Sequence, residues 1–352
     1  MAAYTTIDDP EAYFQVKTYT GNNSTNAQTL DGDTDMEPGM IWFKRRDSAA
    51  NHSVFDAVRG VTKRLATNTT GNDTTVSDAL TSFNSDGFTL GNDASNYINY
   101  NTATYVAWCW KAGTTSGLSG GSITPDAYSF NATSGTSIVK FEGNGSVGAT
   151  VVHGLGAVPK MIIIKGTDLY VNNWQVYHVG GGNTGNYVLN GTDAFADDDS
   201  RWNDTTPTST VWTMGSGATV NYNGRTFVAY LFSDIQGFSK FGTYVGNGNA
   251  DGAFVYTGFR PAFVLNKRSS STANWVIHDN KRTTFNVCNA YLKPNTTAAD
   301  TDDSGRYVDL LSNGFKWRGT DTETNHSGST YIYAAFAEAP FVNSEGVPCN
   351  AR

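Results

Sequence analysis

PGMIWFKR, residues 38–45, is an apolar run that occurs twice more in the chain, as PKMIIIK at residues 159–165 and as PAFVLNK at residues 261–267. The prolines that begin these runs are 121 and 102 residues apart. A second anchor is a threonine followed by an aromatic residue, which occurs at Thr104, Thr226 and Thr330. These threonines are 122 and 104 residues apart. Because two independent anchors agree, the chain contains three homologous copies of one unit.

A unit of about 100 residues is long enough to form a complete β-sandwich. The composition also favours strands, with 18 Tyr, 19 Phe, 8 Trp and 37 Gly among 352 residues. We therefore predict an all-β chain of three tandem homologous, jelly-roll-like β-sandwich domains. The predicted boundaries are residues 1–112, 137–236 and 237–352, with a Gly/Ser-rich linker at 113–136. The one helical signal is Asp9-Pro10-Glu11, where an aspartate cap precedes a proline.

The repeated apolar runs predict buried strands, and the lysine that closes each run is expected at the solvent-exposed end of its strand. These lysines should superpose: Lys44, Lys165 and Lys267. Aromatic residues at matched places in the copies are expected to be core residues. They are Trp42, Phe88, Trp108, Trp174, Trp212, Phe227, Trp275, Phe315 and Tyr331.

Charge and cysteine content exclude several classes of protein. The net charge of −8 and the sequence pI near 5.1 disfavour binding to nucleic acid. The chain has no apolar run of about 18 residues, so insertion into a membrane is not expected. An odd number of cysteines, three, argues against a disulfide framework and fits synthesis in a reducing cytoplasm.

Motifs for catalysis are not found. GNGSVG from Gly143 satisfies a dinucleotide-binding pattern, but a strand-like segment follows where a helix is needed, and the third copy has the equivalent GNGNADG from Gly246. We predict a hairpin turn at both places. His52, His178 and His278 follow the apolar runs without a nucleophile motif, so we predict packing roles for them.

Three acidic clusters are weak candidates for a Ca²⁺ site, since carboxylate oxygens are ligands for this ion. They comprise Asp31, Asp33 and Asp35, then Asp197, Asp198 and Asp199, and finally Asp300, Asp302 and Asp303. The alternative is that each cluster is a solvated loop, and no other cofactor is expected.

Several long segments resemble a known family. They include YTTIDDPEAYFQ from residue 4, IWFKRRDSAANHSVFDAVRGVTKRL from residue 41, HGLGAVPKMIIIK from residue 153 and YIYAAFAEAPFVNSEGVPCNAR from residue 331. The chain is similar to a domain family of unknown function found in virion proteins of marine and aquatic tailed bacteriophages. The resemblance implies a tail fibre or adhesin made of concanavalin-like or SPRY-like sandwiches, placed on the tail or outer capsid of the virion. It also implies contacts with other virion proteins and a homo-oligomer, a trimer by analogy. The family supplies no catalytic residues.

Three functions are consistent with these observations. The first is a tail-associated adhesin that binds a glycan or protein of the host cell surface. The second is a decoration or connector protein of the capsid or tail, without a receptor role. The third is a polysaccharide depolymerase, although no motif supports an enzyme.

If the protein is an adhesin, its contacts should come from loops that differ between the copies. These loops are residues 97–101, 195–203 and 296–306. The candidate receptor-binding residues within them are Tyr97, Tyr100, Asp197, Asp198, Asp199 and Trp202.

Overall fold

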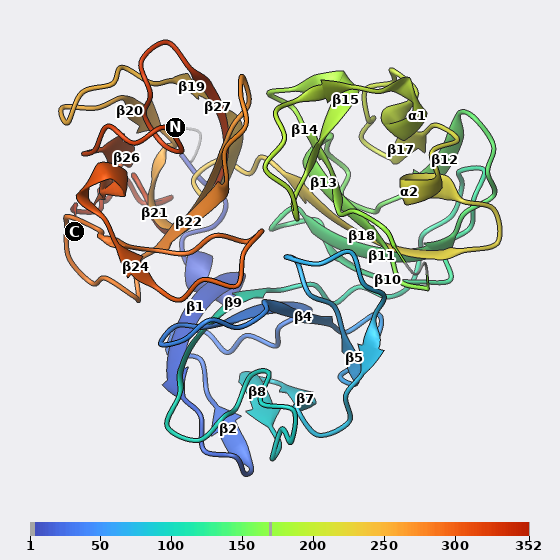
Figure 1. The fold of residues 1–352 in the computed structure, drawn as a ribbon, viewed down its shortest axis with the longest axis horizontal. Helices are drawn as coiled ribbons and strands as arrows, with labels where there is room; N and C mark the ends of the chain where they lie inside the picture. Colours follow the sequence, from blue (N-terminus) through green and yellow to red (C-terminus); the bar gives the residue numbers. More distant parts are fainter. Residues whose placement is uncertain (1–3, 169–170, 352) are drawn as a thin grey trace.

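The protein is described by a computed structural model that covers residues 4–168 and 171–351. It consists almost entirely of antiparallel strands, which confirms the predicted all-β class. Three β-domains lie around a common centre, as in a trefoil (Figure 1). The first domain is at the bottom of that view, the second at the upper right and the third at the upper left.

Each domain places a sheet with the same strand order towards this centre. The first domain uses β1 (Phe14–Thr20), β9 (Thr104–Trp110), β3 (Met40–Arg45) and β4 (Ser53–Asp56). The third uses β19 (Ser239–Val245), β27 (Thr330–Pro340), β21 (Phe259–Arg268) and β22 (Trp275–Asp279). The second uses β11 (Thr136–Glu142), β18 (Thr226–Ser233), β13 (Pro159–Gly166) and β14 (Gln175–His178). The second domain extends this sheet with β10 (Ala127–Asn131), β15 (Gly182–Val188) and β16 (Ala196–Asp197).

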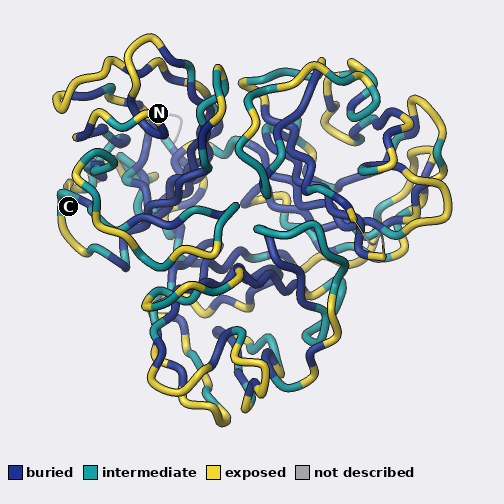
Figure 2. The backbone as a smooth tube through the Cα atoms, viewed as in Figure 1, coloured by how far each residue is buried: buried dark blue, intermediate teal, exposed yellow. Residues whose placement is uncertain are grey.

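The apolar runs form β3, β13 and β21, which are paired on both sides and buried on both faces. In β3, Met40 and Trp42 face the core shared by the three domains, whereas Ile41 and Phe43 face the core of the first domain. In β13, Ile163 faces the shared core and Ile162 faces the core of the second domain, whereas the core of the third domain is continuous with the shared core. Because successive side chains of a strand point to opposite faces, burial of both faces requires a continuous apolar run. Figure 2 shows the resulting concentration of buried backbone at the centre.

A smaller sheet packs on the outer side of each domain. In the first domain it contains β2 (Asn26–Gln28), β8 (Gly87–Leu90) and β7 (Leu80–Asn84). In the second it contains β12 (Ala149–Val152) and β17 (Val211–Met214), and in the third β20 (Phe254–Tyr256), β26 (Gly314–Trp317) and β25 (Val308–Leu311). The nine matched aromatic residues predicted to be core residues are all buried.

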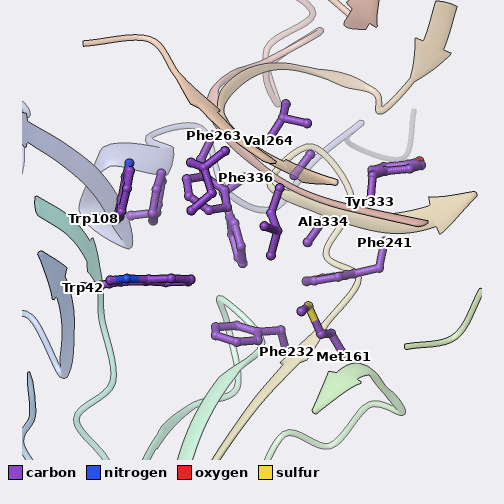
Figure 3. Close-up of a cluster of buried hydrophobic side chains, with 14 of the residues drawn as sticks. Trp42, Trp108, Met161, Phe232, Phe241, Phe263, Val264, Tyr333, Ala334 and Phe336 are labelled. Carbon is purple, nitrogen blue, oxygen red and sulfur yellow. The ribbon is translucent and has the colours of Figure 1, made fainter. Parts of the chain in front are cut away.

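Three aromatic side chains from three domains meet at the centre. Trp110, Phe232 and Phe336 lie on the equivalent strands β9, β18 and β27, where each is opposite the third residue of the apolar run of its own domain. Their ring centroids are 6.1, 5.6 and 5.5 Å apart in the three pairwise combinations. Figure 3 shows Phe232 and Phe336 in this cluster, with Met161 and Phe263 beside them. An apolar void of about 20 Å³ remains between the domains. The three repeats therefore share one core.

The repeat-closing lysines superpose as predicted, since Lys44, Lys165 and Lys267 lie opposite Val106, Val228 and Ile332 on the equivalent neighbouring strands. Their predicted position at a solvent-exposed strand end is wrong, because all three are buried. The Lys44 ammonium donates to Thr297 O of the third domain (3.2 Å), and that of Lys165 donates to Thr70 O of the first (2.9 Å). Burial lowers the pKa of Lys165 to about 7 and that of Lys44 and Lys267 to about 8.

A ring nitrogen at an equivalent position in each repeat contacts a backbone carbonyl of a neighbouring domain. Trp174 Nε1 donates to Ala66 O and Trp275 Nε1 to Val188 O, both at 3.0 Å, while His52 Nε2 lies 3.0 Å from Lys293 O. These polar contacts orient the domains in addition to the apolar core. His178 and His278 are also buried, but they occupy different positions of the repeat, opposite Met161 and Val264.

The segment 113–136 is folded, not a free linker. It contains β10, Thr114 pairs with Phe130, and Ile123 pairs with Val151 of β12. The segment therefore belongs to the second domain. The predicted N-terminal helix is confirmed as a short 3₁₀ turn, η1 (Pro10–Ala12), with Asp9 accepting from Glu11 N.

Short elements complete the described fold: β5 (Lys63–Arg64), β6 (Thr74–Thr75), α1 (Asp199–Trp202), α2 (Ala218–Asn221), β23 (Ala290–Tyr291), β24 (Thr301–Asp302) and η2 (Ser304–Arg306). Across residues 4–168 and 171–351, no helix has the length and apolar character needed to cross a bilayer.

Candidate binding surfaces

The acidic clusters are distributed among ion pairs, helix caps and exposed loops. Asp31 lies 3.3 Å from Lys281, and Asp33 and Asp35 are exposed. Asp300 contacts Arg46 (2.7 Å) and Arg282 (2.8 Å) across two domains. The other members cap short helices or lie at the surface: Asp197, Asp198, Asp199, Asp302 and Asp303. Among the described residues no three His, Cys, Asp or Glu side chains form a group that could hold a metal ion.

The predicted receptor-binding aromatics lie in three different environments. Trp202 is buried and packs edge-on against Tyr177 with ring centroids 5.9 Å apart, so its proposed role at the surface is wrong. Tyr97 is half-buried under the Arg64 guanidinium, 3.9 Å from its ring centroid. Tyr100 is 40% exposed. Trp202 was misassigned because its burial depends on a tertiary contact with β14.

The loop at residues 296–306 makes contacts between domains. Ala50 N donates to Thr297 O (2.8 Å), and Asp300 N donates to Arg46 O (2.7 Å). Together with the Asp300 ion pairs, these bonds attach the third domain to the first.

A buried asparagine holds one outer end of each domain. Asn221 Oδ1 accepts from Asn144 N (2.9 Å), and its Nδ2 donates to Ser146 O (2.9 Å) and Gly215 O (3.0 Å). Asn99 and Asn325 make the equivalent bonds in the first and third domains: Asn99 to Asn22, Ser24 and Gly91, and Asn325 to Asn247, Asn249 and Gly319. GNGSVG is thus a turn held by an asparagine. The predicted hairpin is wrong, because the strands on either side of this turn, β11 and β12, lie in different sheets, as do β19 and β20 around the equivalent turn.

A glycine allows the chain to approach closely at this turn. A Cβ at Gly143 would lie 2.6 Å from Tyr222 O, and Gly21 and Gly246 have equivalent carbonyl contacts at 2.2 and 2.4 Å. The residue that follows this buried asparagine is exposed in every copy: Tyr100, Tyr222 and His326. We call these three ends, each with one exposed ring beside an amide-rich turn, the domain tips. Sequence reasoning missed two of the three rings, although an aromatic residue follows the asparagine each time.

A cleft of about 490 Å³ lies in the third domain beside β20. Its described lining residues are Tyr4, Asp234, Ile235, Gln236, Gly237, Ser239, Lys240, Tyr256, Thr257 and Gly258. Tyr4 Oη donates to Gly258 O and lies 3.0 Å from Tyr256 Oη. The Lys240 ammonium lies 2.9 Å from Asp234 Oδ2, so the charged pair in the wall is neutral overall.

Two exposed aromatics of β20 distinguish the third domain from the others. Phe254 is 47% exposed and Tyr256 is 53% exposed, whereas Val255 between them is buried. The equivalent positions in the other domains follow from the strand registers. Val255 pairs with Phe315, and the matched aromatics Phe88 and Trp212 pair with Gln28 in the first domain and Val151 in the second. Phe254 therefore replaces Ala27 and Thr150, and Tyr256 replaces Thr29 and Val152.

A family model described as "Domain of unknown function (DUF7483)" matches residues 9–340. The chain belongs to the DUF7483 family. The matched region begins at the cap of η1 and ends with the last residue of β27, so the DUF7483 unit contains all three repeats and their shared core. No curated protein and no solved structure shows a match to this chain.

Proposed function

We propose that this chain is a virion protein of a tailed bacteriophage, a tail-associated adhesin that binds the host cell surface without chemical turnover. The virion assignment rests on the sequence resemblance to phage virion proteins. The binding assignment rests on the three domain tips, which place an exposed ring beside backbone and side-chain amides at the same position of each repeat.

The shared core fixes the tips relative to one another. Aromatic faces and amide groups suit recognition of glycans and of protein loops, since both ligands present apolar faces beside hydrogen-bonding groups. Three contacts held in fixed geometry bind a repetitive surface much more tightly than one contact alone. A cell envelope is such a surface.

The three domains of this single chain have an approximately threefold arrangement. We propose that the tips act together as one multivalent face, and that other virion proteins hold the chain on the particle. Association of several chains would multiply these contacts further.

The proposal is tested by competition for adsorption. Purified protein is added to host cells before the phage, and it should reduce the number of adsorbed particles. A variant with Tyr100→Ala, Tyr222→Ala and His326→Ala should compete less well, because it removes the three exposed rings. Phe285→Ala, which removes an exposed ring outside the tips, is the matched control. Thermal unfolding verifies that the variants remain folded.

Two other results would replace the proposal. Absence of binding to host envelopes, together with a location lining the capsid or a tail joint, would favour the connector function. Release of soluble oligosaccharide from host envelopes by the purified protein would establish a depolymerase.

A further inference from the structure

We propose that the cleft beside β20 is an oligosaccharide-binding site, with Tyr256 and Phe254 as its stacking residues. This inference deepens the proposed adhesin function, on which it rests for the origin of the ligand. It adds a ligand class and a site beside the third domain, where the exposed aromatics Phe254 and Tyr256 stand at positions occupied by Ala27, Thr29, Thr150 and Val152 in the other repeats.

Tyr256 lines the cleft, and Phe254 lies two residues before it on β20, outside the lining, so that the two rings extend the aromatic surface beyond the cleft. Residues two apart on a strand point to the same face, about 7 Å from each other along the strand. Phe254 and Tyr256 satisfy this relation, and both are about half exposed. Such a surface can contact successive units of a sugar chain through their apolar faces.

Hydrogen bonds and close contacts hold the N-terminal segment in the cleft wall next to these rings. Thr5 Oγ1 donates to Gln236 O at 2.8 Å, and the Tyr4 hydroxyl donates to Gly258 O at 3.0 Å. Gly237 and Gly258 permit this close approach, since an added Cβ would lie 2.7 Å from Thr5 Oγ1 or 2.8 Å from Tyr4 Oη. The N-terminal segment is thus fixed against the turn that joins the second and third domains.

Polar groups of the cleft match a ligand rich in hydroxyl groups. The Gln236 side chain is exposed, and Lys240 and Asp234 carry donors and acceptors beyond their mutual bond. Since that pair is neutral overall and the chain carries a net charge of −8, a neutral sugar chain fits better than a polyanion. The volume of about 490 Å³ lies within the range of about 300–1,000 Å³ found for small-molecule sites.

Binding without cleavage is favoured by the acidic residue of the cleft. Asp234 is the sole carboxylate among its described lining residues, and it accepts from Lys240 and from Phe241 N (2.9 Å). Glycosidases ordinarily act with two carboxyl groups placed on either side of the scissile bond. The lining therefore matches a binding groove better than a hydrolytic centre.

The test uses the full chain on an array of short bacterial surface oligosaccharides, both neutral and anionic, with titration of any sugar that binds. We expect binding to neutral oligosaccharides. Tyr256→Ala should weaken it roughly tenfold or more, the change that corresponds to about 1.4 kcal/mol. Gln236→Ala should weaken it less, and Phe285→Ala should leave it unchanged. Because Tyr256 and Gln236 are exposed, the variants should melt as the wild type does.

The outcomes separate this inference from the proposed function. If the protein binds host envelopes while no arrayed sugar binds and Tyr256→Ala has no effect, the cleft inference is overturned and the adhesin proposal stands. If arrayed sugars bind through Tyr256 but host envelopes do not, the cleft inference stands and the adhesin proposal fails. Concentration-dependent dimers in sedimentation that Tyr256→Ala dissociates would show that a second copy occupies the cleft, which also overturns the inference.

Discussion

Phe336→Ala should destabilise all three domains together. Phe336 is buried, and its ring has six aromatic neighbours, with centroid distances from 5.2 to 6.1 Å: Phe14, Trp110, Phe232, Phe238, Phe241 and Phe263. Removal of a buried phenylalanine side chain costs about 3–5 kcal/mol. We expect a loss at the upper end of this range, because rings from every domain surround the site and the new cavity adjoins the existing void of about 20 Å³.

The assay is urea denaturation followed by tryptophan fluorescence and by far-ultraviolet circular dichroism. Since the repeats share one core, the wild type should unfold in one transition with coincident probes, and Phe336→Ala should shift that transition as a whole. Phe285→Ala, at an exposed phenylalanine, should change the unfolding free energy by less than about 0.5 kcal/mol. Separate transitions, with only the third affected by the variant, would refute the shared core.

Two further predictions concern buried polar groups. Lys165→Met leaves Thr70 O and Asn172 O without the ammonium donor, but it also removes a buried amine whose pKa burial lowers to about 7 from 10.5 in the unfolded chain. The wild type gains stability as the pH rises from about 7 to 10.5, so the stability of the variant relative to the wild type should be highest at and below pH 7 and should fall across this window by at most a few kcal/mol, at about 1.4 kcal/mol per pKa unit. A difference that does not change between pH 6 and pH 10 in urea denaturation, or an equal effect of the partly exposed control Lys160→Met, would contradict this reasoning. Asn221→Ala should cost about 1–3 kcal/mol, because it leaves buried partners such as Gly215 O unsatisfied, while Asn223→Ala at an exposed site should be neutral by thermal denaturation. Equal melting temperatures for these two variants would show that the hydrogen bonds of Asn221 contribute little to stability.

The candidate sites illustrate the limit of pattern reading. Differences between the repeats were expected to mark receptor loops, yet the loop at residues 296–306 attaches the third domain to the first, and Trp202 packs inside the second. The rings of the domain tips recur in all three repeats, whereas the exposed aromatics of β20 are specific to the third. The aromatics of β20 escaped notice because an alternating strand such as FVY does not reveal which of its faces is covered.

The sequence by itself determined the threefold repetition, the strand-rich class, the positions of the core aromatics and the cap of the first turn. These features depend on spacing, composition and local hydrogen bonding, which can be recognised along the chain. Only the tertiary structure decided what lies against the second face of each apolar strand. Met40 and Trp42 require burial, but nothing local to them indicates that Phe232 and Phe336 from other repeats provide it. For the same reason Lys165 is buried and donates to Thr70 O of another domain, although its place at the end of an apolar run predicted that its side chain would be exposed to solvent.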